Sequence, residues 1–163
     1  MERRDLITRL NQSLKVALIN ISEMPNNDIL IEINKDEIIS VMKRLKEDPS
    51  LKFDSLLNHL GVDCKERFAV IYNLFSFTLN QKITVKAYLD HEAPEISSIE
   101  SVFRGINWFE REAFDMLGIK FTGHSNLKRL LLPADWDGHP LRKDYVYPDE
   151  YHGVDNRRRS NFK

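Results

Sequence analysis

The acidic residues Glu110, Glu112 and Asp115 come nearest to a catalytic pattern in residue type and spacing. Two neighbouring carboxylates can act as a general acid and base, or they can bind a metal ion. Acids near the N-terminal end of a helix are, however, commonly solvated and interact favourably with the helix dipole. No HExxH motif or other two-histidine metal spacing accompanies them in the sequence. A solvated helix face is therefore the favoured interpretation.

Two histidines form a second candidate for metal binding. His124 and His139 lie fifteen positions apart, and Asp135 and Asp144 flank His139. The acidic run around Asp135 does not continue as a calcium-binding loop, because Pro140 stands where that loop needs glycine. Histidines without a ligand spacing are more often structural or interfacial, and we favour that interpretation.

Cys64 is the only cysteine of the chain. It excludes an intramolecular disulfide and a Cys-ligated iron–sulfur cluster, which is what a reducing compartment permits. No nucleophile motif surrounds it, so a buried structural thiol is the favoured interpretation. The glycines form no phosphate-binding loop, and the basic residues 157–159 are read as solvated. The residues alone therefore predict no active site.

The composition narrows the class of protein. The chain has 163 residues, of which 42% are hydrophobic, and its formal net charge is −1. This length favours one domain with an extended arm, and the charge balance argues against a dedicated nucleic-acid binder. No stretch approaches the roughly 20 apolar residues that cross a bilayer. The charged residues 1–5 lack the apolar segment of a secretory signal, so we expect none.

Hydrophobic periodicity predicts the elements that position these residues. Leucines spaced by four from Leu6 predict an N-terminal helix, and a second helix follows an Asn34 cap. Alternating apolar residues predict strands at 29–33, 68–75 and 83–89, the last two as a hairpin. Residues 51–63 fit either a strand or a helix.

Asn107 and Glu110 have capping-box spacing, so a third helix is expected from Asn107 to Gly118, with Arg111 and Asp115 one turn apart. Together these elements predict an α+β fold of two layers, in which helices pack on a largely antiparallel sheet. We assign residues 1–133 to this domain. Residues 134–163 are expected to form an extended arm that docks on a partner.

Two sequence blocks resemble a known family. The first is the run Glu110–Ile119, which reads EREAFDMLGI and continues to His124 and Leu131. The second is the run Leu132–Tyr145, LPADWDGHPLRKDY. Both resemble the C-type subunit of proton-translocating NADH–quinone oxidoreductase, the "30 kDa" subunit of respiratory complex I. Ser125 stands where family members usually have proline, and many members extend further beyond the second block.

The resemblance implies a non-redox scaffold subunit of the peripheral arm that supports electron transfer from NADH to quinone. It implies binding to the large quinone-site subunit of the D type and to the B-type subunit. It also implies that this chain holds no cofactor, while other subunits carry NADH, FMN, iron–sulfur clusters and quinone. Membrane contact would occur only through the complex, on the cytoplasmic side of the bacterial inner membrane or the mitochondrial matrix side. No nucleic acid is expected.

The motif residues then have two expected roles. Glu110, Arg111, Asp115, His124 and Arg129 are expected to form a charged, hydrogen-bonded lattice that fixes the helix to the following loop. Residues of the second block and beyond are expected to dock the arm on a partner, with the tyrosines as anchors. The interface or lattice residues are Glu110, Arg111, Glu112, Asp115, His124, Arg129, His139, Arg142, Asp144 and Tyr145, and Tyr147 and Tyr151 are further anchors.

Three alternatives remain open at this point. The first is the equivalent subunit of a related membrane-bound hydrogenase or of a dehydrogenase that uses ferredoxin or another donor. The second is a freestanding metal-dependent enzyme that uses His124, His139 and nearby acids. The third is a nucleic-acid or lipid binder that acts through residues 157–159.

Overall fold

The computed structural model describes residues 3–15, 17–26 and 28–155. Its core is a five-stranded sheet with the order β1-β2-β5-β4-β3. Neighbouring strands are antiparallel except for β2 and β5, which are parallel. The strands of this sheet are β1 (Leu18–Glu23), β2 (Ile29–Ile33), β3 (Ser55–Asp63), β4 (Arg67–Ser76) and β5 (Gln81–Asp90). The predicted α+β fold with a largely antiparallel sheet is confirmed, and the ambiguous residues 51–63 contain a strand.

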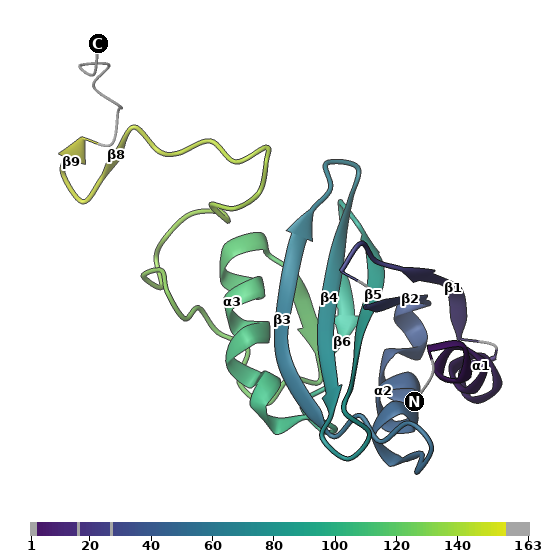
Figure 1. Cartoon of the computed structure of the whole chain (residues 1–163). Coiled ribbons are helices and arrows are strands. Elements are labelled where there is room, and N and C mark those ends of the chain that lie inside the picture. Colours follow the sequence, from purple (N-terminus) through teal and green to yellow (C-terminus); the bar gives the residue numbers. More distant parts are fainter. Residues whose placement is uncertain (1–2, 16, 27, 156–163) are drawn as a thin grey trace.

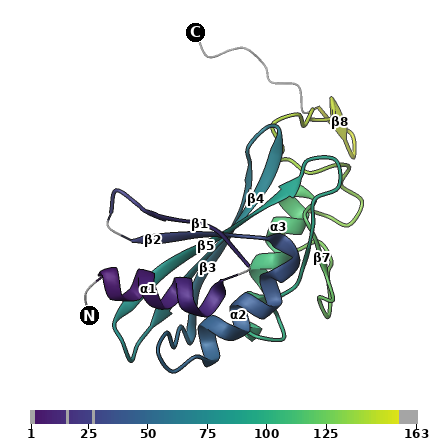
Figure 2. The same ribbon diagram turned by 90° about the vertical axis from the view of Figure 1, so that its right-hand side faces the viewer.

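Helices and short strands complete the fold. In chain order they are α1 (Arg3–Leu14), η1 (Lys35–Glu37), α2 (Ile38–Glu47), β6 (Glu95–Ser97), η2 (Arg104–Ile106), α3 (Asn107–Leu117), β7 (Lys120–Thr122), β8 (Glu150–Tyr151) and β9 (Val154–Asp155). Figure 1 shows α3 beside β3, with α1 and α2 toward the side of the sheet that carries β1 and β2. Figure 2 shows α1 and α2 next to each other. No described helix is long and apolar enough to cross a membrane.

The strands alternate between a buried face and a more polar one. Alternate residues of β4 from Phe68 to Leu74 are buried, as are those of β5 from Ile83 to Leu89. They share one hydrophobic cluster with the apolar stripes of the three helices. The opposite face carries a hydrogen-bonded row in which Asn73 accepts from Thr84 and donates to Asn58. The sheet thus has one helix-covered face, as expected of a two-layer fold.

The hairpin and the helix ends follow the predicted local chemistry in most places. Asn80 has a φ of 48° in the turn before β5, which is the left-handed conformation that asparagine tolerates. Asn34 caps the helical segment by accepting from the backbone N–H of Asp36. Gly118 ends α3 with a φ of 73°. The predicted capping box at Asn107 is wrong. The short helix η2 directly precedes α3, and the N-cap residue of α3 is Ile106.

Gly61 lets α3 approach the sheet closely. A Cβ atom at this position would lie 2.6 Å from Leu117 Cδ1 and 3.1 Å from Ile119 Cδ1. A methyl group at this position would force the ends of these two side chains to move. Glycine at this position therefore favours the close packing of α3 on β3.

The chain beyond β7 is irregular up to the small β8–β9 hairpin. Figure 1 shows this segment running past α3 and then away from the sheet. Its first part nevertheless contacts the domain: the backbone N–H of Leu141 donates to Met116 O at 3.0 Å. The boundary at residue 133 stays a prediction. Residues 157–159 lie outside the described residues.

Candidate functional site

Helix α3 carries charged side chains that are buried. Glu110 and Asp115 are both 0% exposed, and Arg111 is also buried, whereas Glu112 is exposed. The interpretation of a solvated helix face is thus wrong for Glu110 and Asp115. Sequence spacing could not reveal this, because the groups that cover these carboxylates come from segments before and after the helix. Buried charges need hydrogen-bonding partners, and the structure provides them.

Asp115 is the centre of this lattice. Its Oδ2 atom accepts the backbone N–H groups of Leu130, Leu131 and Leu132 at 2.9, 2.7 and 2.9 Å. Its Oδ1 atom accepts from Arg129 Nη1 at 2.7 Å. Burial acts to raise the pKa of Asp115, but these donors outweigh it and hold the pKa below its usual value. The anionic carboxylate therefore fixes residues 129–132 against the helix.

Two arginines extend the lattice in different directions. Arg111 donates from Nε to Lys128 O and from Nη2 to Arg129 O, both at 3.1 Å. Arg111 and Asp115 lie one turn apart on α3, but no hydrogen bond joins them in the described structure. Arg129 instead bridges Asp115 to the arm, because its Nη2 atom donates to Trp136 O at 2.8 Å and Gly138 O at 3.0 Å. The guanidinium fork suits this role, since it offers several donors in a fixed plane.

The C-terminal end of α3 is capped by the second sequence block. His139 Nδ1 donates to Asp115 O at 2.9 Å, and Arg142 Nε donates to Leu117 O at 2.7 Å. The last carbonyl groups of a helix lack intrahelical partners and attract positive charge, so both contacts are favourable. A Cβ atom on Gly118 would lie 2.6 Å from the His139 ring. Glycine is therefore favoured at this position by the His139 contact as well as by its positive φ. Arg142 also lies over the Phe68 ring, 5.1 Å from its centre.

Glu110 anchors the other half of α3. Its carboxylate accepts from Ser98 Oγ at 2.6 Å and from Ile99 N at 3.0 Å. Burial raises the pKa of Glu110 to about 7, against the effect of these two donors. His124 Nε2 lies 3.9 Å from Glu110 and 3.1 Å from Asn107 O. Because His124 Nδ1 accepts from Asn126 N, its Nε2–H group donates to that carbonyl.

Ser125 makes two contacts with the carboxylate of Glu100. Its backbone N–H donates to Glu100 Oε2 at 2.9 Å, and its hydroxyl donates to Glu100 Oε1 at 2.8 Å. Asn107 donates to the same carboxylate at 2.7 Å. These donors hold the pKa of Glu100 down to about 2. Proline has no N–H group and could not make the backbone contact.

The tyrosines of the arm differ in their surroundings. Tyr145 accepts from Trp136 Nε1 and donates to Asp137 O, both at 3.0 Å. Tyr151 donates to Asp135 at 2.9 Å. Tyr147 is 57% exposed. Docking on a partner stays a prediction for all three residues, and the contacts within the chain show that the first two also shape the arm.

The structure separates the residues of the alternative metal hypothesis. His124 lies against the first turn of α3 and His139 against the last carbonyls of that helix. Among the described residues, the side chains that gather closely enough to share a metal ion are Asp63, His91 and Asp144. Sequence reasoning missed Asp63 and His91 because they lie far apart in the chain. Cys64 is exposed, so its interpretation as a buried thiol is wrong.

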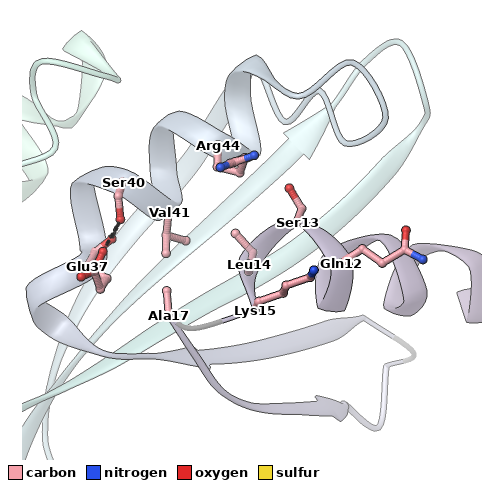
Figure 3. Close-up of a pocket in the computed structure, with 9 residues that line it drawn as sticks. All are labelled: Gln12, Ser13, Leu14, Lys15, Ala17, Glu37, Ser40, Val41 and Arg44. Carbon is pink, nitrogen blue, oxygen red and sulfur yellow. Dashed lines mark hydrogen bonds between the residues drawn. The ribbon is translucent and has the colours of Figure 1, made fainter.

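A pocket between α1 and α2 is separate from these residues. Figure 3 shows Leu14 and Val41 lining it. Two of its polar residues, Glu37 and Ser40, are joined by a hydrogen bond of 2.6 Å. The lining residues do not form a recognisable catalytic or metal-binding set, so we assign no chemistry to the pocket.

Comparison with known proteins identifies the family of the chain. Residues 31–151 match the family model described as respiratory-chain NADH dehydrogenase, 30 Kd subunit. The chain belongs to this family. Both blocks that form and surround the lattice lie within the matched residues. The family is a subunit family of an oxidoreductase complex, so this chain is one subunit of a complex I assembly.

Relatives and solved structures extend the comparison. The chain is 40% identical over 147 residues to the C-type subunit of NADH-quinone oxidoreductase from Roseiflexus sp. (strain RS-1), covering 88% of this chain and 84% of that one. It is 41% identical to the corresponding subunit from Xanthobacter autotrophicus (strain ATCC BAA-1158 / Py2), covering 86% and 68%. A trypsin-resistant fragment of Nqo5 has a TM-score of 0.65 at 24% identity, covering 76% of this chain and 99% of the fragment.

A second solved structure is a chain of the membrane-bound sulfane sulfur reductase, an archaeal respiratory membrane complex. It has a TM-score of 0.73 at 20% identity and covers 89% of this chain and 86% of that one. At these identities both structural likenesses show the fold alone.

Proposed function

We propose that this chain is a scaffold subunit that binds no redox cofactor and uses its C-terminal arm to hold neighbouring subunits of NADH–quinone oxidoreductase together. The proposal rests on one observation: the first part of the arm is attached to the domain, while its later part exposes apolar side chains. Arg129, His139 and Arg142 tie its first part to helix α3. Farther on, the arm presents apolar side chains to solvent, with Val146 84% exposed and Val154 62% exposed. Exposed apolar side chains on an anchored segment are suited to burial in a partner.

The hydrogen bonds between α3 and the loop that follows it support scaffolding over catalysis. Asp115, Arg111 and Arg129 spend their hydrogen bonds on backbone groups of this chain and on one another. A catalytic acid or base needs access to a substrate, whereas Asp115 is fully buried and both of its carboxylate oxygens accept hydrogen bonds within the chain. Within the family, the partners that such an arm would meet are the large quinone-site subunit of the D type and the B-type subunit. The complex would then place NADH, FMN, iron–sulfur clusters and quinone in its other subunits, with this chain at the cytoplasmic side of the bacterial inner membrane or its mitochondrial equivalent.

Affinity purification of the tagged chain from membranes tests the proposal. We expect the large quinone-site subunit and NADH–quinone activity to co-purify with the wild-type chain. The double variant Val146→Asp/Tyr147→Ser is expected to lower the recovered partner about tenfold or more, because it places a charge in an apolar contact. Phe77→Ser is the matched control, since Phe77 is 72% exposed but lies on the β4–β5 turn. Equal recovery with both variants would refute docking through the arm.

The alternative assignment is the equivalent subunit of a related respiratory membrane complex; a chain of the same fold occurs in the membrane-bound sulfane sulfur reductase, an archaeal respiratory membrane complex. Activity of the purified complex with NADH, reduced ferredoxin or hydrogen as donor distinguishes the two assignments. Reduction of quinone by NADH supports the first, and activity restricted to another donor supports the second.

A further inference from the structure

Three potential metal ligands from distant parts of the chain meet at one end of the sheet. Asp63 is the last residue of β3, His91 directly follows β5, and Asp144 belongs to the arm. One ligand atom from each of them lies within 4.8 Å of the others. The sheet register explains the meeting, because Asp63 pairs with Phe68 on β4 and Phe68 pairs with Leu89 on β5. The site is therefore built by the fold and not by local sequence.

The surrounding contacts orient two of the three ligands. Asp63 is only 6% exposed, and its two carboxylate oxygens accept the backbone N–H groups of Lys65 at 2.7 Å and Lys143 at 2.8 Å. Each oxygen keeps a lone pair for a further partner. The His91 ring stacks on Phe68 with centres 5.1 Å apart and an interplanar angle of 10°. Such contacts around the ligands are typical of metal sites, where they fix side-chain orientation.

The donor set indicates the kind of ion. One imidazole and two carboxylates suit a divalent transition metal of borderline softness, and zinc often takes three protein ligands with water as the fourth. We propose that Asp63, His91 and Asp144 bind one zinc ion that ties the arm to the sheet. Lys143 lies near enough to act electrostatically on Asp63, so zinc competes with an ammonium group and binds less tightly than at a closed four-ligand site.

Zinc binding to the full-length chain tests this proposal directly. Isothermal titration is expected to show one zinc ion per chain, and cobalt substitution should give visible absorption bands. His91→Asn and Asp144→Asn should each weaken zinc binding about tenfold or more, since each removes one of three ligands. His152→Asn is the matched control, because His152 Nε2 lies 2.7 Å from Asp135 in an exposed pair. It should leave zinc binding unchanged.

A second measurement reports on the arm. Zinc should slow trypsin cleavage after Arg142 and Lys143 in the wild-type chain but not in Asp144→Asn. Circular dichroism of each variant verifies that it is folded, and His91→Gln replaces His91→Asn if the latter unfolds. The proposal is overturned if the wild-type chain shows no saturable zinc binding, or if binding is equally weakened in His152→Asn. Neither result would bear on docking of the arm to its partners, which is measured separately.

Discussion

Replacement of Asp115 by alanine is the sharpest test of the lattice on α3. The side chain is fully buried and accepts four hydrogen bonds, from Arg129 and from three successive backbone N–H groups. Bonds to a charged group contribute about 1.5–3 kcal/mol each, so their sum would reach about 6 kcal/mol or more. Leu131 is exposed, however, so water can enter this part of the loop after the substitution and replace some of the lost bonds. Arg129 also keeps its carbonyl partners at Trp136 and Gly138.

The expected loss is therefore that of a broken buried ion pair, about 3–5 kcal/mol of unfolding free energy. Urea denaturation of the full chain, followed by circular dichroism, measures it. Glu112→Ala is the control, because Glu112 lies on the same helix and is exposed; its effect should stay within about 0.5 kcal/mol. A loss below about 1 kcal/mol for Asp115→Ala would contradict four buried hydrogen bonds and refute the reasoning that the lattice fixes the loop to the helix.

The pH dependence supplies an independent check on the same residue. The pKa of Asp115 is lowered in the folded chain, so its contribution is fully present above the pKa of an unfolded aspartate, about 4. That contribution is lost as the pH falls through the lower folded value. Asp115→Ala should therefore differ most from the wild-type chain at neutral pH, and the difference should shrink in acid. A difference that does not change with pH would contradict a role for the charge.

Two further predictions concern other parts of the domain. Burial raises the pKa of Glu110 to about 7, so the folded chain binds a proton that the unfolded chain releases, and stability should fall as the pH rises from about 4.5 to 7. Glu110→Gln should reduce this change of unfolding free energy with pH, which urea denaturation at several pH values measures. An unchanged slope in the variant would contradict the raised pKa of Glu110. Gly61→Ala should cost about 1–3 kcal/mol, because its Cβ would lie 2.6 Å from Leu117 Cδ1. Thermal unfolding measures this, with Gly105→Ala as control, since a Cβ there meets nothing within 4 Å.

The elements of the fold were largely predictable because their signals are local. The alternation in β4 and β5, the left-handed turn at Asn80 and the glycine end of α3 each depend on neighbouring residues. Strand β1 was not predicted, because it is a partly exposed strand whose residues show little alternation between buried and exposed positions. This segment forms a strand because it pairs with β2, and a pairing between segments cannot be recognised from the local sequence.

The chemistry of α3 was less predictable because it depends on distant segments. Nothing in the spacing of Glu110 and Asp115 shows that Ser98 precedes the helix at hydrogen-bonding distance, or that residues 130–132 fold back over it. The resemblance to the family suggested a hydrogen-bonded lattice, but it did not predict which backbone groups the charged side chains would bond. Arg111 illustrates the limit, since helix geometry favours Asp115 while backbone carbonyls of the following loop provide its actual partners.

The single parallel pair of the sheet has a consequence for how the chain folds during synthesis. Strand β2 pairs with β5, whose residues follow it by about 50 positions, so closing this contact costs loop entropy that the β4–β5 hairpin does not require. A ribosome releases β2 long before β5 is complete. Until then the isoleucines of β2, all buried in the folded chain, lack their central partner strand. The nascent chain therefore exposes an aggregation-prone β-strand, which is the kind of segment that chaperones bind.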